Sequence, residues 1–216
     1  MRKERPEEKY INEVFGFKDA ELQAVKDRLL AEGVSHMSIS GHEARLLQFL
    51  IRSMNVKKVV EVGTLFGYSA IAMAKALPQD GHLITLEKNP TNFEVAQRLI
   101  QTSSVATKIE SLCGDAEALL QSIESQGPFD LVFIDANKAG YVKYLDWAEK
   151  NVRKGGLIIG DNTFLFGALW GVSDDREAGP NQIKVMTEFN QRLSNSVQYN
   201  SIIIPTSEGM TIAQKL

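Results

Sequence analysis

Two short motifs in the second half of the chain, FIDANK and GDN, contain the residues best suited to chemistry. Each motif ends an apolar run that is typical of a β-strand, so Asp135, Asp161 and Asn162 are expected at strand ends. Carboxylate and amide oxygens are hard ligands that suit Mg²⁺ or Ca²⁺, with water or substrate completing the shell. The motifs therefore predict a metal site. Lys138 is either a solvated charge at a helix start or part of a reactive centre beside that site.

Acidic residues also end the other expected strands. Glu61 and Glu87 lie at the ends of the first and second strands, and Asp115 lies just beyond the third. In open α/β sheets, ligands bind outside the carboxyl ends of the strands. An acid in this position is often only a helix N-cap. Five carboxylates at one edge, however, would repel one another unless cations balanced them, so together they predict a positively charged ligand, a metal ion, or both.

The segment EVGTLFGYS, from Glu61 to Ser69, joins the first strand to a helix. It lacks the G-x-G-x-x-G spacing that brings backbone amides to a pyrophosphate, and no G-x-x-x-x-G-K-[ST] motif occurs elsewhere. Gly63 and Gly67 on their own indicate no more than a tight turn. Glu87 ends the second strand, where an acid commonly accepts hydrogen bonds from a ribose. The loop and Glu87 together predict a nucleoside site without a pyrophosphate.

The elements that position these residues are short β-rich runs that alternate with helices, from KKVVEVG to GLIIGDN. This alternation is typical of βαβ units and predicts an α/β fold. The last two strands, VQYNSIIIP and MTIAQKL, are joined only by TSEG, which is too short for a crossover helix and makes them antiparallel. Residues 1–35 are expected to form a helical segment. Ser40 and Glu43 have capping-box spacing at the start of a helix over residues 40–54.

The length and composition exclude several classes of protein. A chain of 216 residues with 44% apolar residues is expected to form one domain, with residues 1–35 as a helical segment and residues 36–216 as the core. One cysteine excludes a disulfide framework and indicates a reduced compartment. A net charge of −3 disfavours nucleic-acid binding without excluding it. The charged N-terminus and short apolar runs indicate a cytoplasmic protein without a membrane partner.

Taken together, the motifs resemble those of class I S-adenosylmethionine-dependent methyltransferases. More narrowly, they are similar to the divalent-metal-dependent O-methyltransferases that include the caffeoyl-CoA and catechol enzymes. The resemblance runs from about Met37 to the C-terminus and is carried by EVGTLFGYS, LITLEK, GDA, FIDANK, GDN and SEGMTIAQK. It implies a Rossmann-like fold with a seven-stranded, mostly parallel sheet, an antiparallel C-terminal strand and helices on both faces. Members of the family are commonly homodimers.

The resemblance also implies roles for particular residues. Contacts to the cofactor S-adenosylmethionine would come from Met37, Ile39, Glu61, Gly63, Thr64, Tyr68, Ser69, Glu87, Asp115, Ala116 and Asp135. Within this set, Glu87 would hold the ribose hydroxyls, while Asp115 and Ala116 would hold the adenine. A divalent cation, with Mg²⁺ expected and Ca²⁺ or Mn²⁺ as alternatives, would bind Asp135, Asp161 and Asn162. Related sequences often carry D-A-D-K where this chain has DANK, a change that bears on local electrostatics more than on metal binding.

The expected reaction is methyl transfer to a hydroxyl oxygen of a small, catechol-like aromatic. A phenol with a pKa near 10 is a poor nucleophile at pH 7. A bound divalent cation lowers the pKa of an oxygen acid and orients two adjacent hydroxyls. Asp135 would take part as a metal ligand. Lys138 would be a general base or the electrostatic partner of the oxyanion, secondary to the metal.

Other functions stay open. Methylation of a hydroxylated tRNA base, of the 5-hydroxyuridine type, would be favoured by a basic face formed by Arg45, Arg52, Lys57 and Lys58, although the net charge speaks against it. A nicotinamide-dependent oxidoreductase is disfavoured by the missing G-x-G-x-x-G motif. A non-catalytic S-adenosylmethionine-binding module would not need the metal ligands or Lys138, all of which are present.

Overall fold

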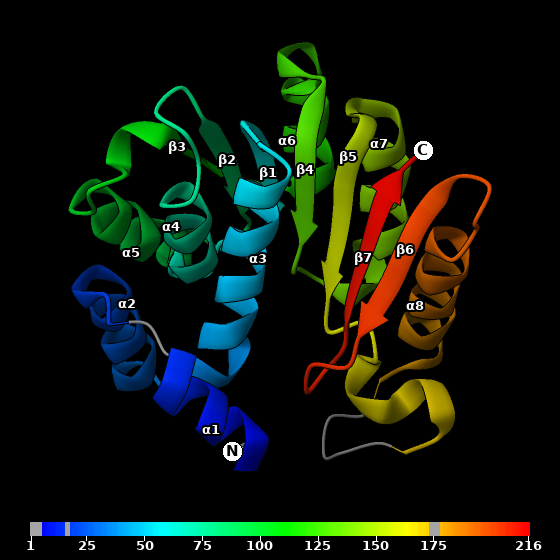
Figure 1. Ribbon diagram of the computed structural model, residues 1–216, viewed down its shortest axis with the longest axis horizontal. Helices are drawn as coiled ribbons and strands as arrows, with labels where there is room; N and C mark the ends of the chain where they lie inside the picture. The colour runs from blue at the N-terminus through cyan, green and yellow to red at the C-terminus, as the bar shows by residue number, and fades with distance from the viewer. Residues whose placement is uncertain (1–5, 16–17, 173–177) are drawn as a thin grey trace. The chain divides into compact units, whose positions relative to one another are not determined.

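A computed structural model describes residues 6–15, 18–172 and 178–216. The chain divides into two compact units (Figure 1). Unit 1 comprises residues 1–57 and 64–114, and unit 2 comprises residues 58–63 and 115–216. The expectation that residues 1–216 act as one domain stays a prediction.

The described residues form one sheet of seven strands in the order β3-β2-β1-β4-β5-β7-β6. The strands are β1 (Lys58–Val62), β2 (His82–Glu87), β3 (Ile109–Cys113), β4 (Phe129–Ile134), β5 (Val152–Asp161), β6 (Tyr199–Ile204) and β7 (Met210–Lys215). The pairs β1/β4, β2/β3 and β4/β5 are parallel, whereas β7 is antiparallel to both β5 and β6. The predicted α/β class, with a mostly parallel sheet and an antiparallel last strand, is confirmed.

Unit 1 carries strands β2 and β3 and the helices of the first half of the chain. Its helices are α1 (Pro6–Phe15), α2 (Ala20–Ala31), α3 (Gly41–Ser53), α4 (Tyr68–Ala74) and α5 (Pro90–Gln101), with short 3₁₀ turns at Ser35–Met37 and Ala106–Lys108. The predicted capping box is present: the backbone N–H of Ser40 donates to Glu43 Oε2 at 2.7 Å, and the N–H of Glu43 donates to Ser40 Oγ at 3.3 Å. Helix α2 buries Leu22, Val25 and Leu29, which are spaced by three and four residues and so lie on one face of the helix.

Unit 2 carries the other five strands of the sheet. Its helices are α6 (Ala116–Ser122), α7 (Tyr141–Asn151) and α8 (Pro180–Leu193), with 3₁₀ turns at Glu124–Gln126, Lys138–Gly140 and Leu165–Trp170. Helix α7 packs on β4 and β5, and α8 packs on β7. The residues of β4 from Leu131 to Ile134 are fully buried, which gives this unit an apolar centre.

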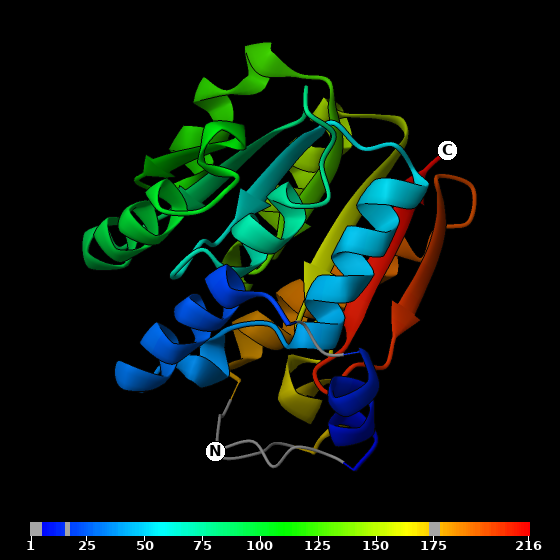
Figure 2. The same ribbon diagram turned by 60° about the vertical axis from the view of Figure 1, so that its left-hand side comes forward.

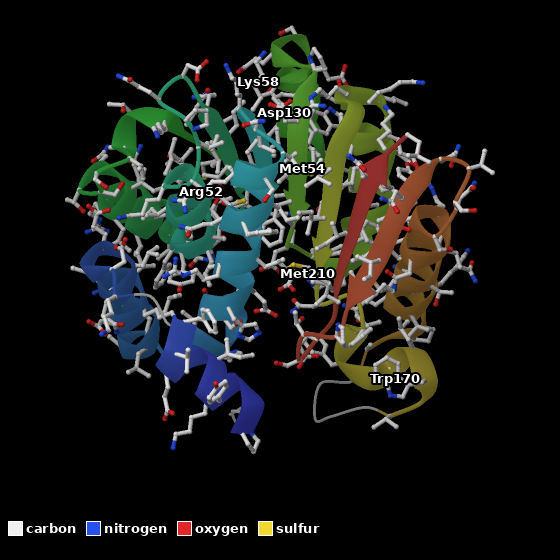
Figure 3. The ribbon with its side chains drawn as sticks, viewed as in Figure 1. Arg52, Met54, Lys58, Asp130, Trp170 and Met210 are labelled. Carbon is white, nitrogen blue, oxygen red and sulfur yellow. The ribbon has the colours of Figure 1, made fainter. Side chains whose placement is uncertain are left out.

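The C-terminal strands form the predicted hairpin, and Figures 1 and 2 both show β6 beside β7. Ile204 pairs with Met210 across the TSEG connection, in which Gly209 has a φ of 73°. Strand β7 also pairs with β5, and Met210 lies opposite Asp161. In Figure 3, Met210 therefore marks the edge of unit 2 where β5 ends, while Lys58 and Asp130 mark the opposite edge. Within the described residues, none of the helices has the length and apolar character needed to cross a membrane.

Candidate active site

Two neighbouring strands of unit 2 bring the predicted metal ligands to one edge of the sheet. Strands β4 and β5 pair in parallel up to Ile134 and Gly160, so Asp135 and Asp161 directly follow paired positions. Asp161 is 3% exposed, and the amide nitrogen of Asn162 donates to Asp161 Oδ2 at 3.1 Å. The structure thus brings two carboxylates and one amide to the ends of adjacent strands.

Lys138 lies beside these carboxylates and is not a solvated surface charge, because its side chain is only 11% exposed. Its ammonium group contacts three oxygens: Tyr141 Oη at 2.5 Å, the backbone oxygen of Asp161 at 3.3 Å, and Asp135 Oδ1 at 3.4 Å. Asn137 caps the turn that begins at Lys138 by accepting the N–H of Ala139 at 3.2 Å. Of the two interpretations of Lys138, the structure favours the one beside the reactive centre.

Tyr141 is a member of this site that the motifs did not reveal. The residue is fully buried, and its hydroxyl lies 2.8 Å from the carbonyl oxygen of Asp161 and 3.1 Å from that of Ile134. Burial raises the pKa of Tyr141 well above its usual range, and the carboxylates of Asp135 and Asp161 add to the rise. The hydroxyl therefore stays protonated and joins the ends of β4 and β5. The spacing of three residues from Lys138 was the available signal in the sequence.

Asn162 occupies a left-handed turn directly after β5, with a φ of 54°. Two backbone hydrogen bonds from the hairpin hold this turn: the N–H of Thr163 donates to Gly209 O at 3.0 Å, and that of Phe164 donates to Glu208 O at 2.9 Å. A Cβ at Gly209 would lie 2.5 Å from the ring of Phe164. Glycine is needed there, because both the positive φ and the close ring exclude a side chain.

The other predicted residues of unit 2 lie at the ends of β1 and β3. Glu61 is fully buried near the end of β1. Gly63 has a φ of 105°, and a Cβ there would collide with the carbonyl oxygen of Asp135, so the turn after β1 needs glycine. Asp115 is exposed and caps α6 by accepting the N–H of Glu117 at 3.1 Å, and Ala116 begins that helix. The N-cap alternative is therefore realised at Asp115, and its contact with adenine stays a prediction.

In unit 1, Glu87 organises the loop that follows β1. Its two carboxylate oxygens accept the backbone N–H groups of Leu65 and Asn89, both at 2.8 Å. Thr64 Oγ1 lies 2.5 Å from Thr85 Oγ1. The remaining candidates of this unit are buried Ile39, Tyr68 and Ser69, and Met37, which is 55% exposed. Two backbone donors therefore fix the orientation of the Glu87 carboxylate, and its contact with a ribose stays a prediction.

The chemistry of the donor set at the ends of β4 and β5 fits a divalent cation. Among the described residues, no three His, Cys, Asp or Glu side chains gather into a metal-binding group. The predicted set instead combines two carboxylates with an amide, and these oxygen donors are the kind that Mg²⁺ takes together with water and substrate. Asp135, Asp161 and Asn162 can therefore supply part of a coordination shell.

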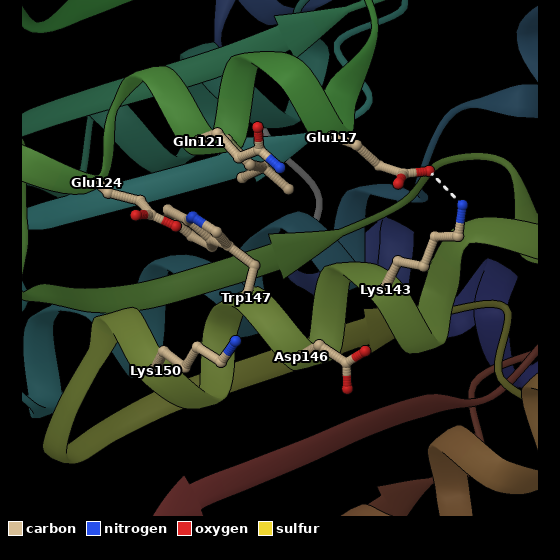
Figure 4. Close-up of a pocket in the computed structure, with 8 residues that line it drawn as sticks. Glu117, Gln121, Glu124, Lys143, Asp146, Trp147 and Lys150 are labelled. Carbon is tan, nitrogen blue, oxygen red and sulfur yellow. Dashed lines mark hydrogen bonds and ion pairs between the residues drawn. The ribbon is translucent and has the colours of Figure 1, made fainter.

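A surface groove lies between α6 and α7 of unit 2 (Figure 4). It is lined by Glu117, Leu120, Gln121, Glu124, Lys143, Asp146, Trp147 and Lys150. Lys143 pairs with Glu117 at 2.7 Å, and Asp146 pairs with Arg192 at the same distance. Charges that pair with neighbours on the surface are typical of a solvated face, so the groove adds nothing to the candidate site.

Comparison with known proteins identifies the family. The parallel sheet with an antiparallel last strand and polar residues at the carboxyl ends of its strands is the architecture of Rossmann-like methyltransferases. A model of the family described as O-methyltransferase matches residues 16–216. The chain therefore belongs to the O-methyltransferase family, and the resemblance predicted from its motifs is confirmed.

Two named relatives and two solved structures illustrate the relationship. The chain is 35% identical to a catechol O-methyltransferase from Niastella koreensis over 90% of its length and 87% of that protein. It is 33% identical to a caffeoyl-CoA O-methyltransferase from Populus kitakamiensis over 85% and 80% of the two chains. A Streptomyces achromogenes O-methyltransferase of tomaymycin synthesis, solved with SAM, has a TM-score of 0.87 at 27% identity over 100% and 99% of the two chains. A Bacillus cereus O-methyltransferase with SAH has a TM-score of 0.86 at 27% identity over 96% of each chain.

Proposed function

We propose that this protein transfers a methyl group from S-adenosylmethionine to a hydroxyl oxygen of a small, catechol-like aromatic, in a reaction that requires a divalent cation. The observation that carries the proposal is that Asp135, Asp161 and Asn162 lie at one edge of unit 2, beside the side chain of Lys138, which is only 11% exposed. The catechol and caffeoyl-CoA relatives support the choice of a hydroxylated aromatic acceptor.

Asp135, Asp161 and Asn162 are the residues proposed to hold the cation, which we take to be Mg²⁺. When bound, a divalent cation lowers the pKa of a coordinated hydroxyl and orients its neighbour. Asp135 and Asp161 lie at the ends of two paired strands. Their placement on paired strands keeps the ligands in a fixed relation, which favours a site formed before substrate binds.

Lys138 is proposed to stabilise the negative oxygen of the acceptor electrostatically. Its ammonium already faces three oxygen acceptors, on Asp135, Tyr141 and Asp161. This arrangement favours the role of electrostatic partner over that of general base, because a base must first give up a proton. In the role of electrostatic partner, the Lys138 side chain would offset the negative charge on the acceptor oxygen, and the proton of the acceptor hydroxyl would leave to solvent.

S-adenosylmethionine is proposed as the methyl donor because the Streptomyces achromogenes and Bacillus cereus structures hold SAM and SAH. The proposed contacts in unit 1 are Met37, Ile39, Thr64, Tyr68, Ser69 and Glu87, and those in unit 2 are Glu61, Gly63, Asp115, Ala116 and Asp135. In unit 1, the fixed carboxylate of Glu87 supports a ribose contact. Isothermal titration of the parent and a Glu87→Gln variant with S-adenosylhomocysteine tests this assignment.

We further propose that the chain acts as a single catalytic domain and as a homodimer in the cytoplasm. The single cysteine, Cys113, is free and exposed, which suits a reducing compartment. Light scattering coupled to size-exclusion chromatography tests the oligomeric state. A monomer at micromolar concentration would exclude the dimer.

The deciding experiment is transfer of a labelled methyl group from S-adenosylmethionine to catechol, with Mg²⁺ and again with excess chelator. We expect turnover with Mg²⁺ that disappears with chelator and returns when Mg²⁺ is restored. Phenol, which lacks the second hydroxyl, is the matched acceptor control and should react far more slowly. Cofactor binding without methylation of catechol under either condition would count against a small aromatic acceptor. Hydroxylated tRNA would then be the next acceptor to test.

A further inference from the structure

We propose that Asn190 and Thr211 are positioning residues that fix the turn carrying Asn162 and thereby set the affinity of unit 2 for its divalent cation. The inference rests on the proposed function, because it takes Asn162 as a ligand of that cation. Thr211 lies within SEGMTIAQK, one of the stretches that carry the family resemblance, but neither residue was assigned a role in the site. Asn190 lies on α8, and Thr211 lies on β7.

The Asn162 turn needs contacts from other elements, because its backbone has a left-handed conformation that residues other than glycine rarely adopt. The φ of Asn162 is 54°, and Leu165 and Phe166 follow with φ values of 49° and 56°. Asparagine tolerates this region better than most residues, but three such conformations within five positions persist only where surrounding contacts hold them. The direction of the Asn162 amide depends on that backbone.

A hydrogen-bonded network supplies the support immediately after Asn162. The side-chain nitrogen of Asn190 donates to the carbonyl oxygen of Thr163 at 2.9 Å. The hydroxyl of Thr211 donates to the side-chain oxygen of Asn190 at 2.8 Å and also lies 2.9 Å from the hydroxyl of Thr163. The Thr211 hydroxyl is the donor toward both oxygens, and because it carries one hydrogen, the two acceptors share it. Thr211 therefore links the side chain of Asn190 to that of Thr163.

The network joins three separate elements, and two of its three members are buried. Thr163 is fully buried and Thr211 is 2% exposed. Thr211 pairs with Gly160 across β5 and β7, one position before Asp161. Removing one partner would leave buried polar groups without their bonds, and such networks weaken as a unit. The carbonyl of Thr163, one residue after the proposed ligand, would then lose its side-chain donor.

Replacing a residue that hydrogen-bonds to a metal ligand and orients it typically lowers metal affinity by about 10–100-fold. Thr211→Val is nearly isosteric and removes only the hydroxyl. Asn190→Asp keeps an acceptor for Thr211 but presents an oxygen to the carbonyl of Thr163. We expect each variant to raise the dissociation constant for Mn²⁺ about tenfold, measured from the electron paramagnetic resonance signal of free Mn²⁺. Thr211→Ser, which restores the hydroxyl, should return within about twofold of the parent.

Leu193→Ala is the matched control for a general loss of stability, because Leu193 is fully buried on the same helix as Asn190. It should lower the thermal midpoint and leave the Mn²⁺ dissociation constant unchanged. The inference is overturned if Thr211→Val and Asn190→Asp lower the midpoint but bind Mn²⁺ like the parent. If the parent itself binds no Mn²⁺, the proposed metal site is wrong, and the positioning role is wrong with it. If the parent binds Mn²⁺ and the two variants bind it equally well, only the positioning role is wrong.

Discussion

The two edges of the sheet in unit 2 both carry acidic residues, but their partners differ. At the amino edge, Asp130 accepts from Arg153 Nε at 2.5 Å with one oxygen and from the N–H of Lys58 at 2.8 Å with the other. Figure 3 labels Lys58 and Asp130 at this edge. At the carboxyl edge, Asp135 lies 3.4 Å from the ammonium of Lys138, and Asp161 lies on the neighbouring strand.

The two edges differ in the length of the contact between a carboxylate and its cationic neighbour. Charge-assisted hydrogen bonds of about 2.7–2.9 Å are the strong ones. Both hydrogen bonds to Asp130 fall within or below this range of distances, and the Arg153 guanidinium balances the charge of the carboxylate. At the carboxyl edge, the ammonium of Lys138 stands at a longer distance beside two carboxylates and an amide. The short ion pair makes Asp130 a structural contact at the amino edge, whereas the carboxylates of the carboxyl edge lie beside Lys138 and Asn162, the other residues of the proposed site.

The strongest test of this comparison is Asp135→Asn at the carboxyl edge. At pH 7, a phenol with a pKa near 10 is ionised to about one part in 10³, so loss of metal activation should lower the turnover of catechol by about 10³-fold. Mn²⁺ binding should weaken in parallel. Initial rates at saturating cofactor and acceptor measure the effect. A variant within tenfold of the parent would show that Asp135 is not needed for activation.

Lys138→Ala tests the ammonium at the same edge. We expect a loss of about 10²-fold in turnover, because the charge that develops on the acceptor oxygen loses a nearby cation, while dependence on Mg²⁺ is retained. Lys143→Ala is the matched control, since Lys143 is an exposed lysine of α7 paired with Glu117. Full activity in the Lys138→Ala variant would remove Lys138 from the mechanism.

Tyr141→Phe tests whether the carboxyl edge is also held together by a buried hydroxyl. The carbonyl oxygens of Ile134 and Asp161 share this donor, and its loss should lower the free energy of unfolding by about 1–3 kcal/mol. Urea denaturation measures the change. Tyr144→Phe removes a hydroxyl from the next turn of α7 and should cost less. Equal losses in the two variants would contradict a special role for Tyr141.

Asp130→Asn tests the opposite edge, where we expect an effect on stability without an effect on chemistry. Loss of the ion pair with Arg153, whose side chain is 38% exposed, should cost about 1 kcal/mol in the free energy of unfolding. Turnover at saturating substrate should stay within about twofold of the parent. A large loss of turnover with unchanged Mn²⁺ affinity would show that the two edges are not functionally distinct.

A partly buried ion cluster in unit 1 extends the comparison and should give an effect on stability of about the same size, without an effect on turnover. Lys75 pairs with Asp19 at 2.8 Å and with Glu21 at 2.7 Å. The hydrogen bond from Lys75 lowers the pKa of Glu21 below its ordinary value of 4.5. For Asp19, burial opposes the change, but the bonds from Lys75 and the backbone of α2 outweigh it and lower the pKa below 3.8.

A carboxylate whose pKa is lowered by folding stabilises the protein above its unfolded pKa, and this stabilisation is lost as the pH falls through the folded value. Lys75→Met should therefore lower the free energy of unfolding by about 1 kcal/mol near neutral pH. The difference from the parent should shrink between about pH 5 and pH 3. Denaturation of both proteins across this range checks the sign. A constant difference would mean that Lys75 acts through packing.

Much of the fold could be predicted from local patterns. The capping box at Ser40 and Glu43, the alternation of strands and helices, and the short TSEG connection each depend on residues close together in the chain. The candidate ligands Asp135, Asp161 and Asn162 could be located because strand ends follow from apolar runs. The environment of Lys138 could not be predicted, since its 11% exposure depends on packing against β4, β5 and α7.

The sequence by itself determined the α/β class, the family motifs and the types of residue available for metal binding, because these follow from local periodicity and side-chain chemistry. Only the tertiary structure decided which polar residues support them. Asn190 and Thr211 lie 27 and 48 residues from Thr163, and they meet it only because α8 and β7 pack against the end of β5. Contacts over such separations depend on strand register and helix packing, which no local pattern encodes.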